Sequence, residues 1–162
     1  MNIIFIGNVQ LSALALKKLI QIGLTPTGVI TNTISHKNAD FEDLIKISTL
    51  HKIPTLDTCK INEKRTVDWI KRQKPNVIFC VGWSQIISSE ILSIPSLGVI
   101  GFHPSALPAN RGRHPIIWAL VLGLTQTAST FFFLDEDVDS GRIISQEIVA
   151  IFPEDDAADL YG

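Results

Sequence analysis

Asn2-Ile3-Ile4-Phe5-Ile6-Gly7 is a short run of apolar, mostly β-branched residues that ends in glycine. Such a run is typical of a strand that is buried on both faces of a parallel sheet. The next segment, 12–22, sets leucine and isoleucine against lysine and glutamine, which predicts an amphipathic helix closed by Gly23. The chain therefore begins with a strand and a crossover helix.

The same alternation continues along the chain. Apolar runs predict strands at 26–31, 53–56, 77–81, 97–102, 129–134 and 143–151, and helical patterns occupy 40–51, 62–73, 88–94 (capped by Ser88) and 115–122. Strands that alternate with helices favour right-handed crossovers. We therefore expect an α/β fold with a Rossmann-like, mostly parallel twisted sheet and helices on both faces. Ligands bind such a sheet outside the carboxyl ends of its strands.

Length and charge narrow the class of protein. A chain of 162 residues predicts one domain, 1–162. The net charge is −2 and the basic residues are dispersed, so no basic face is available to neutralise phosphates. A general nucleic-acid binder is therefore disfavoured.

Cysteine content and hydropathy indicate the compartment. Cys59 and Cys80 lack CxxC spacing, so neither a disulfide framework nor a zinc site is predicted. We expect no signal peptide, because the apolar start 1–7 lacks a basic segment before it, and no apolar run is long enough to span a bilayer. We expect a cytoplasmic protein without a membrane partner.

A histidine and a carboxylate form the strongest candidate for catalysis. His103 follows the apolar run 97–102, so the predicted strand places it at the carboxyl edge of the sheet. Asp139 comes later, in a turn that contains Gly141. A carboxylate partner can fix the tautomer of a histidine and orient its ring. A single histidine is more often structural, but two strand-end positions together favour catalysis.

Two further loops of this edge carry candidate binding residues. The turn 7–10, with Asn8 and Gln10, could present backbone N–H groups to a phosphate, although it lacks the GxGxxG pattern and equally suits a plain tight turn. The loop 82–87 mixes an aromatic and apolar residues with polar ones. That mixture suits a flat heteroaromatic ring, and core packing is the alternative.

Arg111 and Arg113 flank a glycine in a loop rich in turn residues. Two guanidinium groups there could hold a phosphate or a carboxylate, and a solvated loop is the alternative. No set of His and Cys residues has the spacing of metal ligands, so no metal is predicted.

His103-Pro104-Ser105-Ala106-Leu107-Pro108, followed at matched spacing by Asp139-Ser140-Gly141, resembles the signature of the formyltransferases that use 10-formyltetrahydrofolate. This family includes glycinamide ribonucleotide formyltransferase, methionyl-tRNA formyltransferase and the nucleotide-sugar N-formyltransferases. The resemblance extends from the first strand to Ile151. It implies the formyltransferase fold, an N-formyltransferase catalytic domain, and 10-formyltetrahydrofolate as cosubstrate without a metal.

The resemblance also implies roles for individual residues. His103 would be the catalytic histidine, Asp139 its carboxylate partner, and Leu107–Pro108 a candidate cis peptide. The pterin would lie between Trp83, Ser84, Gln85, Ile86 and Ile87 on one side and the loop of Asp135 to Asp139 on the other. The motif Arg111-Gly112-Arg113-x-Pro115 with Trp118, and the turn Gly7-Asn8-Val9-Gln10, are most similar to the sugar-modifying branch. Asn8, Gln10, Arg111 and Arg113 would then bind the acceptor.

The chain departs from the family pattern in two respects. The family places an asparagine, whose amide helps to hold the formyl oxygen, where this chain has Gly101. Another group must substitute, with Asn8, Asn110 and Ser105 as candidates, or activity is reduced. The family's catalytic domains also continue beyond a helix that this chain only begins, so we expect a truncated domain. Apolar surface left uncovered there would favour a homodimer.

The expected reaction is transfer of a formyl group from 10-formyltetrahydrofolate to the primary amine of a nucleotide-linked amino sugar. Two alternatives remain open. The acceptor could be methionyl-tRNA, against which the net charge and the missing C-terminal domain count. The chain could also be a folate- or nucleotide-binding module without turnover, which Gly101 and the abrupt end favour.

Overall fold

The computed structural model describes residues 1–33 and 40–161, in two compact units, Met1–Ile100 and Gly101–Gly162. The first unit contains β1 (Ile3–Ile6), α1 (Gln10–Gln21), β2 (Gly28–Thr31), α2 (Ile45–Leu50), β3 (Thr55–Asp57), α3 (Lys64–Gln73), β4 (Val77–Cys80) and α4 (Ser89–Leu92). β5 (Val99–His103) begins in the first unit and ends in the second, which also contains α5 (Pro115–Val121), β6 (Gln126–Phe133), β7 (Ile143–Ala150) and α6 (Ala157–Tyr161).

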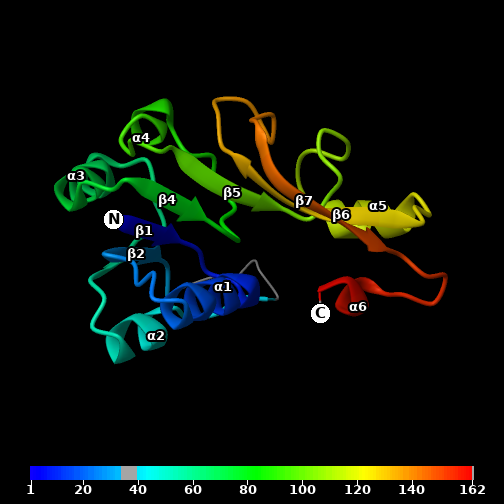
Figure 1. Ribbon diagram of the computed structural model, residues 1–162, viewed down its shortest axis with the longest axis horizontal. Helices are drawn as coiled ribbons and strands as arrows, with labels where there is room; N and C mark the ends of the chain where they lie inside the picture. The colour runs from blue at the N-terminus through cyan, green and yellow to red at the C-terminus, as the bar shows by residue number, and fades with distance from the viewer. Residues whose placement is uncertain (34–39, 162) are drawn as a thin grey trace. The chain divides into compact units, whose positions relative to one another are not determined.

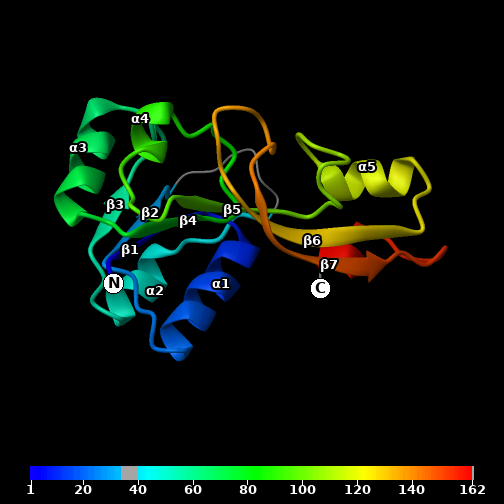
Figure 2. The same cartoon turned by 45° about the horizontal axis from the view of Figure 1, so that its top comes forward.

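The strands form a seven-stranded sheet in the order β3-β2-β1-β4-β5-β6-β7. β1 pairs in parallel with β2 and β4, β2 pairs in parallel with β3, and β6 pairs antiparallel with β7. In the first unit, α1 and α2 lie on one face of these strands and α3 and α4 on the other (Figures 1 and 2). The predicted α/β class and the mostly parallel sheet are confirmed.

The core of the first unit is built on β1, whose four residues are all buried. Strands that are covered on both faces carry apolar residues at every position, as this one does. Gly28 of β2 shows how closely α3 approaches, because a Cβ there would lie 2.5 Å from the indole ring of Trp69. Burial raises the pKa of the Cys80 thiol to about 12, so this group stays protonated near neutral pH.

Two local predictions for the first unit were wrong. The helix expected over 40–51 is confined to Ile45–Leu50, because the Gln10 N–H donates to Asp40 O and the Glu42 N–H donates to Asn8 O. These bonds hold the segment after Asp40 extended beside the turn that precedes α1. Ser88 does occupy the N-cap position of α4, but its side chain makes no capping hydrogen bond.

In the second unit, β6 and β7 run side by side as an antiparallel hairpin (Figure 1). Ala128, Thr130 and Phe132 of β6 are buried, at every second position of the strand. The register shifts between Phe131 and Phe132, next to the loop that joins the two strands. That loop carries Asp139.

None of the helices within the two described ranges is both long enough and apolar enough to cross a membrane.

Candidate functional site

His103 is the last residue of β5. Buried and half-buried residues alternate along this strand, so His103 lies on the same, buried face as positions 99 and 101. His103 is buried, with 7% of the residue exposed. Its Nδ1 lies 3.6 Å from Asp139 Oδ2, and its Nε2 lies 3.1 Å from the carbonyl oxygen of Asn110. A carbonyl oxygen only accepts, so Nε2 carries the proton of that hydrogen bond. Both ring nitrogens therefore face oxygen acceptors.

Asp139 is held in place by the backbone of a neighbouring loop. Its Oδ2 accepts a hydrogen bond of 2.8 Å from the Gly112 N–H. The residue has φ +50°, in the left-handed region that aspartate tolerates better than most side chains. Asp135, expected at the pterin site, accepts a 2.6 Å hydrogen bond from the Ser140 hydroxyl and so closes the loop around Asp139. The predicted approach of His103 and Asp139 is present, at a separation longer than a direct hydrogen bond.

The loop after His103 is tied to the β6–β7 hairpin by side chains that sequence reasoning missed. The Thr130 hydroxyl donates to Ser105 O at 2.6 Å, and Gln146 Nε2 lies within hydrogen-bond distance of Leu107 O (3.0 Å) and of the Thr130 hydroxyl (2.9 Å). Thr130 and Gln146 are directly paired across the hairpin. The Leu107–Pro108 peptide in this loop is cis, as expected.

Replacing Gln146 with leucine should lower the free energy of unfolding by about 1 to 3 kcal/mol, because Leu107 O loses its donor in a part-buried place while the side-chain volume is kept. Urea unfolding followed by circular dichroism measures the difference. Ser145→Ala, an exposed change on the same strand, is the control. If the two variants unfold at the same urea concentration, the Gln146 contact does not stabilise the loop.

The side-chain position at residue 101 is already filled. A Cβ on Gly101 would lie 2.5 Å from Leu134 Cδ2 and 3.3 Å from Phe132 Cε1. Ser105 and Asn110, two of the candidates to replace the missing asparagine amide, belong to the second unit. The Ser105 hydroxyl donates its hydrogen bond to Ala109 O, and Asn110 contacts the imidazole through its backbone carbonyl rather than its amide.

In the first unit, the turn 7–10 and the loop 82–87 lie beside each other. The Ser12 hydroxyl donates to Val81 O at 2.6 Å, and a Cβ on Gly82, which has φ +66°, would overlap the Val9 side chain. The N–H groups of Gly7, Val9 and Gln10 are bonded to Ile30 O, Ser12 Oγ and Asp40 O, respectively. The turn therefore does not offer these three groups to a phosphate, which agrees with the alternative of a plain tight turn.

The side chains predicted to bind a ligand in the first unit differ in burial and in hydrogen bonding. Trp83 Nε1 and Asn8 Oδ1 are buried and have no hydrogen-bond partner among residues 1–33 and 40–161, whereas Asn8 Nδ2 donates to Asn32 Oδ1 at 2.9 Å. Ile87 is buried, while Gln10, Ser84 and Ile86 are exposed. A buried donor or acceptor without a partner is costly, so Trp83 and Asn8 are places where a ligand atom would be stabilising.

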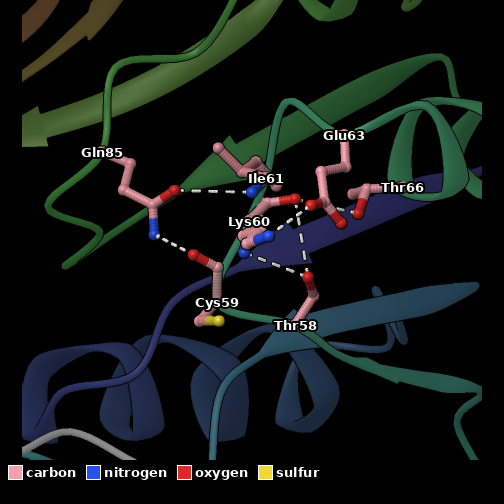
Figure 3. A network of polar contacts seen from close by, with 7 residues as sticks. All are labelled: Thr58, Cys59, Lys60, Ile61, Glu63, Thr66 and Gln85. Atoms are coloured by element: carbon pink, nitrogen blue, oxygen red, sulfur yellow. Dashed lines mark hydrogen bonds and ion pairs between the residues drawn. The ribbon is translucent and has the colours of Figure 1, made fainter.

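Gln85 serves the chain itself (Figure 3). Its Nε2 donates to Cys59 O at 2.8 Å and its Oε1 accepts from the Ile61 N–H at 3.4 Å. Asn62 completes the attachment, since its Nδ2 donates to Ile86 O and its Oδ1 accepts from the Ser88 N–H. The loop 82–87 is therefore fixed by the segment 59–62 through contacts that the sequence did not indicate.

Arg111 and Arg113 are exposed and line a hollow at the start of α5. Across the described ranges, no three His, Cys, Asp or Glu side chains gather as a metal ion would require.

Comparison with known proteins identifies a family that this chain matches. A family model described as "Formyl transferase" matches residues 1–162. Methionyl-tRNA formyltransferase of Geobacter sulfurreducens is 32% identical over 166 residues, which are 99% of this chain and 52% of that protein. The chain thus spans about half the length of such curated relatives.

Solved structures share the fold. Phosphoribosylglycinamide formyltransferase from Bacillus halodurans has a TM-score of 0.84 and 22% identity, over 99% of this chain and 86% of that one. WlaRD, described as a sugar 3N-formyl transferase in the presence of dTDP and 5-N-formyl-THF, has a TM-score of 0.76 and 21% identity, over 99% of this chain and 56% of that one. At these identities the likeness concerns the fold alone.

Proposed function

This chain belongs to the formyl transferase family, and from that premise we propose that it transfers a formyl group from 10-formyltetrahydrofolate to the primary amine of a nucleotide-linked amino sugar. The observation that carries the proposal is the buried His103, with one ring nitrogen toward the Asp139 carboxylate and the other bonded to a carbonyl that a substrate oxygen can replace. Membership of the family supports formyl transfer as the chemistry of this pair.

When bound, 10-formyltetrahydrofolate supplies the carbon that the acceptor amine attacks. A new C–N bond forms, the bond between that carbon and N10 breaks, and the amine gives up one proton while N10 takes one. His103 donates its Nε2 proton toward the formyl oxygen, where negative charge develops. The Asp139 carboxylate faces Nδ1 and keeps the ring oriented. Bringing both reactants to this position accounts for a large part of the acceleration.

The first unit offers groups that suit the two substrates. Trp83 Nε1, which is buried and has no partner in the described part of the chain, can donate to an acceptor atom of a pterin ring. Asn8 Oδ1 can accept from a hydroxyl or amine of the acceptor. Gly101 with Leu134 leaves no amide at the formyl oxygen, so we expect His103 to act there without help from residue 101. Loss of one such donor costs a rate factor of about 10² to 10³.

Two observations favour a nucleotide-linked amino sugar as acceptor. Arg111 and Arg113 carry positive charges that complement the phosphates of a nucleotide, and the net charge of −2 disfavours tRNA. Methionyl-tRNA is the second candidate, because relatives that are 32% identical carry that name.

The test is to incubate the full chain with 10-formyltetrahydrofolate and, separately, with dTDP- and UDP-linked amino sugars, methionyl-tRNA and glycinamide ribonucleotide. Release of tetrahydrofolate is followed by absorbance and the formylated product by mass spectrometry. We expect turnover with an amino sugar. Turnover with methionyl-tRNA alone would replace the acceptor, and folate binding without turnover would indicate a binding module.

A further inference from the structure

The second unit contains a hollow with a volume of about 240 Å³ next to the loop that follows His103. Its lining consists of Asn110, Arg111, Arg113, Pro115, Trp118 and Leu122. Of these described lining residues, two are cations and none is a carboxylate. Among the residues that the structure describes, neither arginine forms an ion pair. Two free guanidinium groups on one hollow favour a ligand with more than one anionic group.

Part of the lining is apolar. α5 buries Ile116 and Ala119, and this leaves Trp118 and Leu122 on another side of the helix, one turn apart. Trp118 is 54% exposed and Leu122 is 58% exposed. An exposed indole beside a leucine offers a flat surface on which an aromatic ring can stack.

The loop that carries the two arginines has an unusual backbone, with three residues at positive φ. Asn110 and His114 have φ +55° and +58°, and Gly112 has φ +97°. Left-handed conformations are uncommon outside glycine, although asparagine and histidine adopt them more readily than most residues, and unusual backbone conformations are concentrated at binding and catalytic sites. The two arginines alternate with these three residues, and both line the hollow.

We propose that this hollow binds the nucleoside diphosphate part of the acceptor, with the base stacked on Trp118 and the two phosphates held by Arg111 and Arg113. This inference rests on the proposed function and assigns a place to the nucleotide. The amide of Asn110 is available in the hollow for a polar edge of the base, since an amide can both donate and accept.

The same loop connects the hollow to the histidine. Asn110 O is bonded to His103 Nε2, and Gly112 N–H is bonded to Asp139 Oδ2, so residues on either side of Arg111 contact the pair. The loop that lines the hollow therefore also contacts the two side chains proposed to act in formyl transfer. The sugar of a nucleotide bound in the hollow would extend toward these side chains.

Binding can be measured without turnover. Isothermal titration calorimetry of the full chain with dTDP, UDP, ADP, pyrophosphate and p-aminobenzoylglutamate compares nucleotides with an anion alone and with the aromatic, anionic part of a folate. We expect a nucleoside diphosphate to bind more tightly than pyrophosphate. Trp118→Ala should weaken it about five- to a hundredfold, the range for loss of one base–aromatic stack. Trp118→Phe should restore most of the affinity.

The arginines are tested by the double variant Arg111→Ala/Arg113→Ala. The unchanged chain should bind the nucleoside diphosphate more tightly at low salt than at high salt, and the double variant should lose this salt dependence. Arg72→Ala, an exposed arginine of α3, and Val121→Ala, an exposed residue of α5 outside the lining, are the matched controls and should bind as the unchanged chain does. Circular dichroism checks that each variant is folded.

Unchanged nucleotide binding in the Trp118 and arginine variants would overturn the inference, as would the absence of nucleotide binding. Selective loss of p-aminobenzoylglutamate binding would assign the hollow to the folate instead and also overturn it. The proposed function fails separately: nucleotide binding in the hollow without formyl transfer to any amino sugar would leave the inference intact. Formyl transfer that is insensitive to Trp118→Ala would leave the function and remove the hollow from it.

Discussion

Replacement of His103 by alanine should reduce formyl transfer by about 10² to 10⁴, the usual contribution of a positioned acid–base group. The imidazole is the side chain that meets both Asp139 and Asn110 O, so its removal leaves no donor at the position where the formyl oxygen gains charge. The measurement is the rate of tetrahydrofolate release at saturating substrates. Far-ultraviolet circular dichroism should be unchanged.

Two further variants make this prediction specific. Asp139→Asn keeps the size of the side chain and an oxygen for the Gly112 N–H but removes the charge that faces Nδ1, so kcat should fall while KM changes little. His51→Ala, an exposed histidine of the first unit, is the control and should retain full activity. A His103→Ala protein that formylates at the original rate would eliminate the proposed mechanism.

The buried strands could be predicted from the sequence because their apolar runs coincide with the parallel ladder. β1 and β4 fall within the runs that predicted them. β6 begins three residues earlier than the expected start at Ser129, since Gln126, Thr127 and Ala128 carry no strong apolar signal. Their pairing with 148–150 of β7 makes them a strand, and pairing is not visible in a local pattern.

The approach of His103 and Asp139 could be predicted because residues that follow strands gather at one edge of the sheet. The groups that fix the pair could not. Asn110 and Gly112 act through backbone atoms, which every residue has, and Gln146 acts from a hairpin whose register the sequence leaves open. Gln85 was predicted to bind a ligand because it is a polar residue in a loop at this edge. Its side-chain amide instead donates to the backbone of Cys59 and fixes the loop.

The glycine of the Asp139-Ser140-Gly141 motif leads to the largest expected effect on stability. A Cβ on Gly141 would overlap the carbonyl oxygen of Phe133 and lie 2.8 Å from its carbonyl carbon. Both atoms belong to backbone, which no side-chain rotation can move, and the Phe133 N–H is bonded to Arg142 O beside them. Gly141→Ala therefore has to open the end of the β6–β7 hairpin. We expect a loss of about 3 kcal/mol or more in the free energy of unfolding.

Gly123→Ala separates this contact from the general effect of placing alanine at a glycine. Gly123 has no atom within 4 Å of the position a Cβ would take, but its φ of +62° costs an alanine about 1 to 2 kcal/mol. Urea unfolding of both variants should therefore place Gly141→Ala well below Gly123→Ala. Because the opened hairpin end carries the loop of Asp139, Gly141→Ala should also lose formyl transfer at temperatures where it remains folded, whereas Gly123→Ala should keep it. Equal stability of the two variants would mean that the hairpin accommodates the Cβ, and that the glycine is not required by its contact with Phe133.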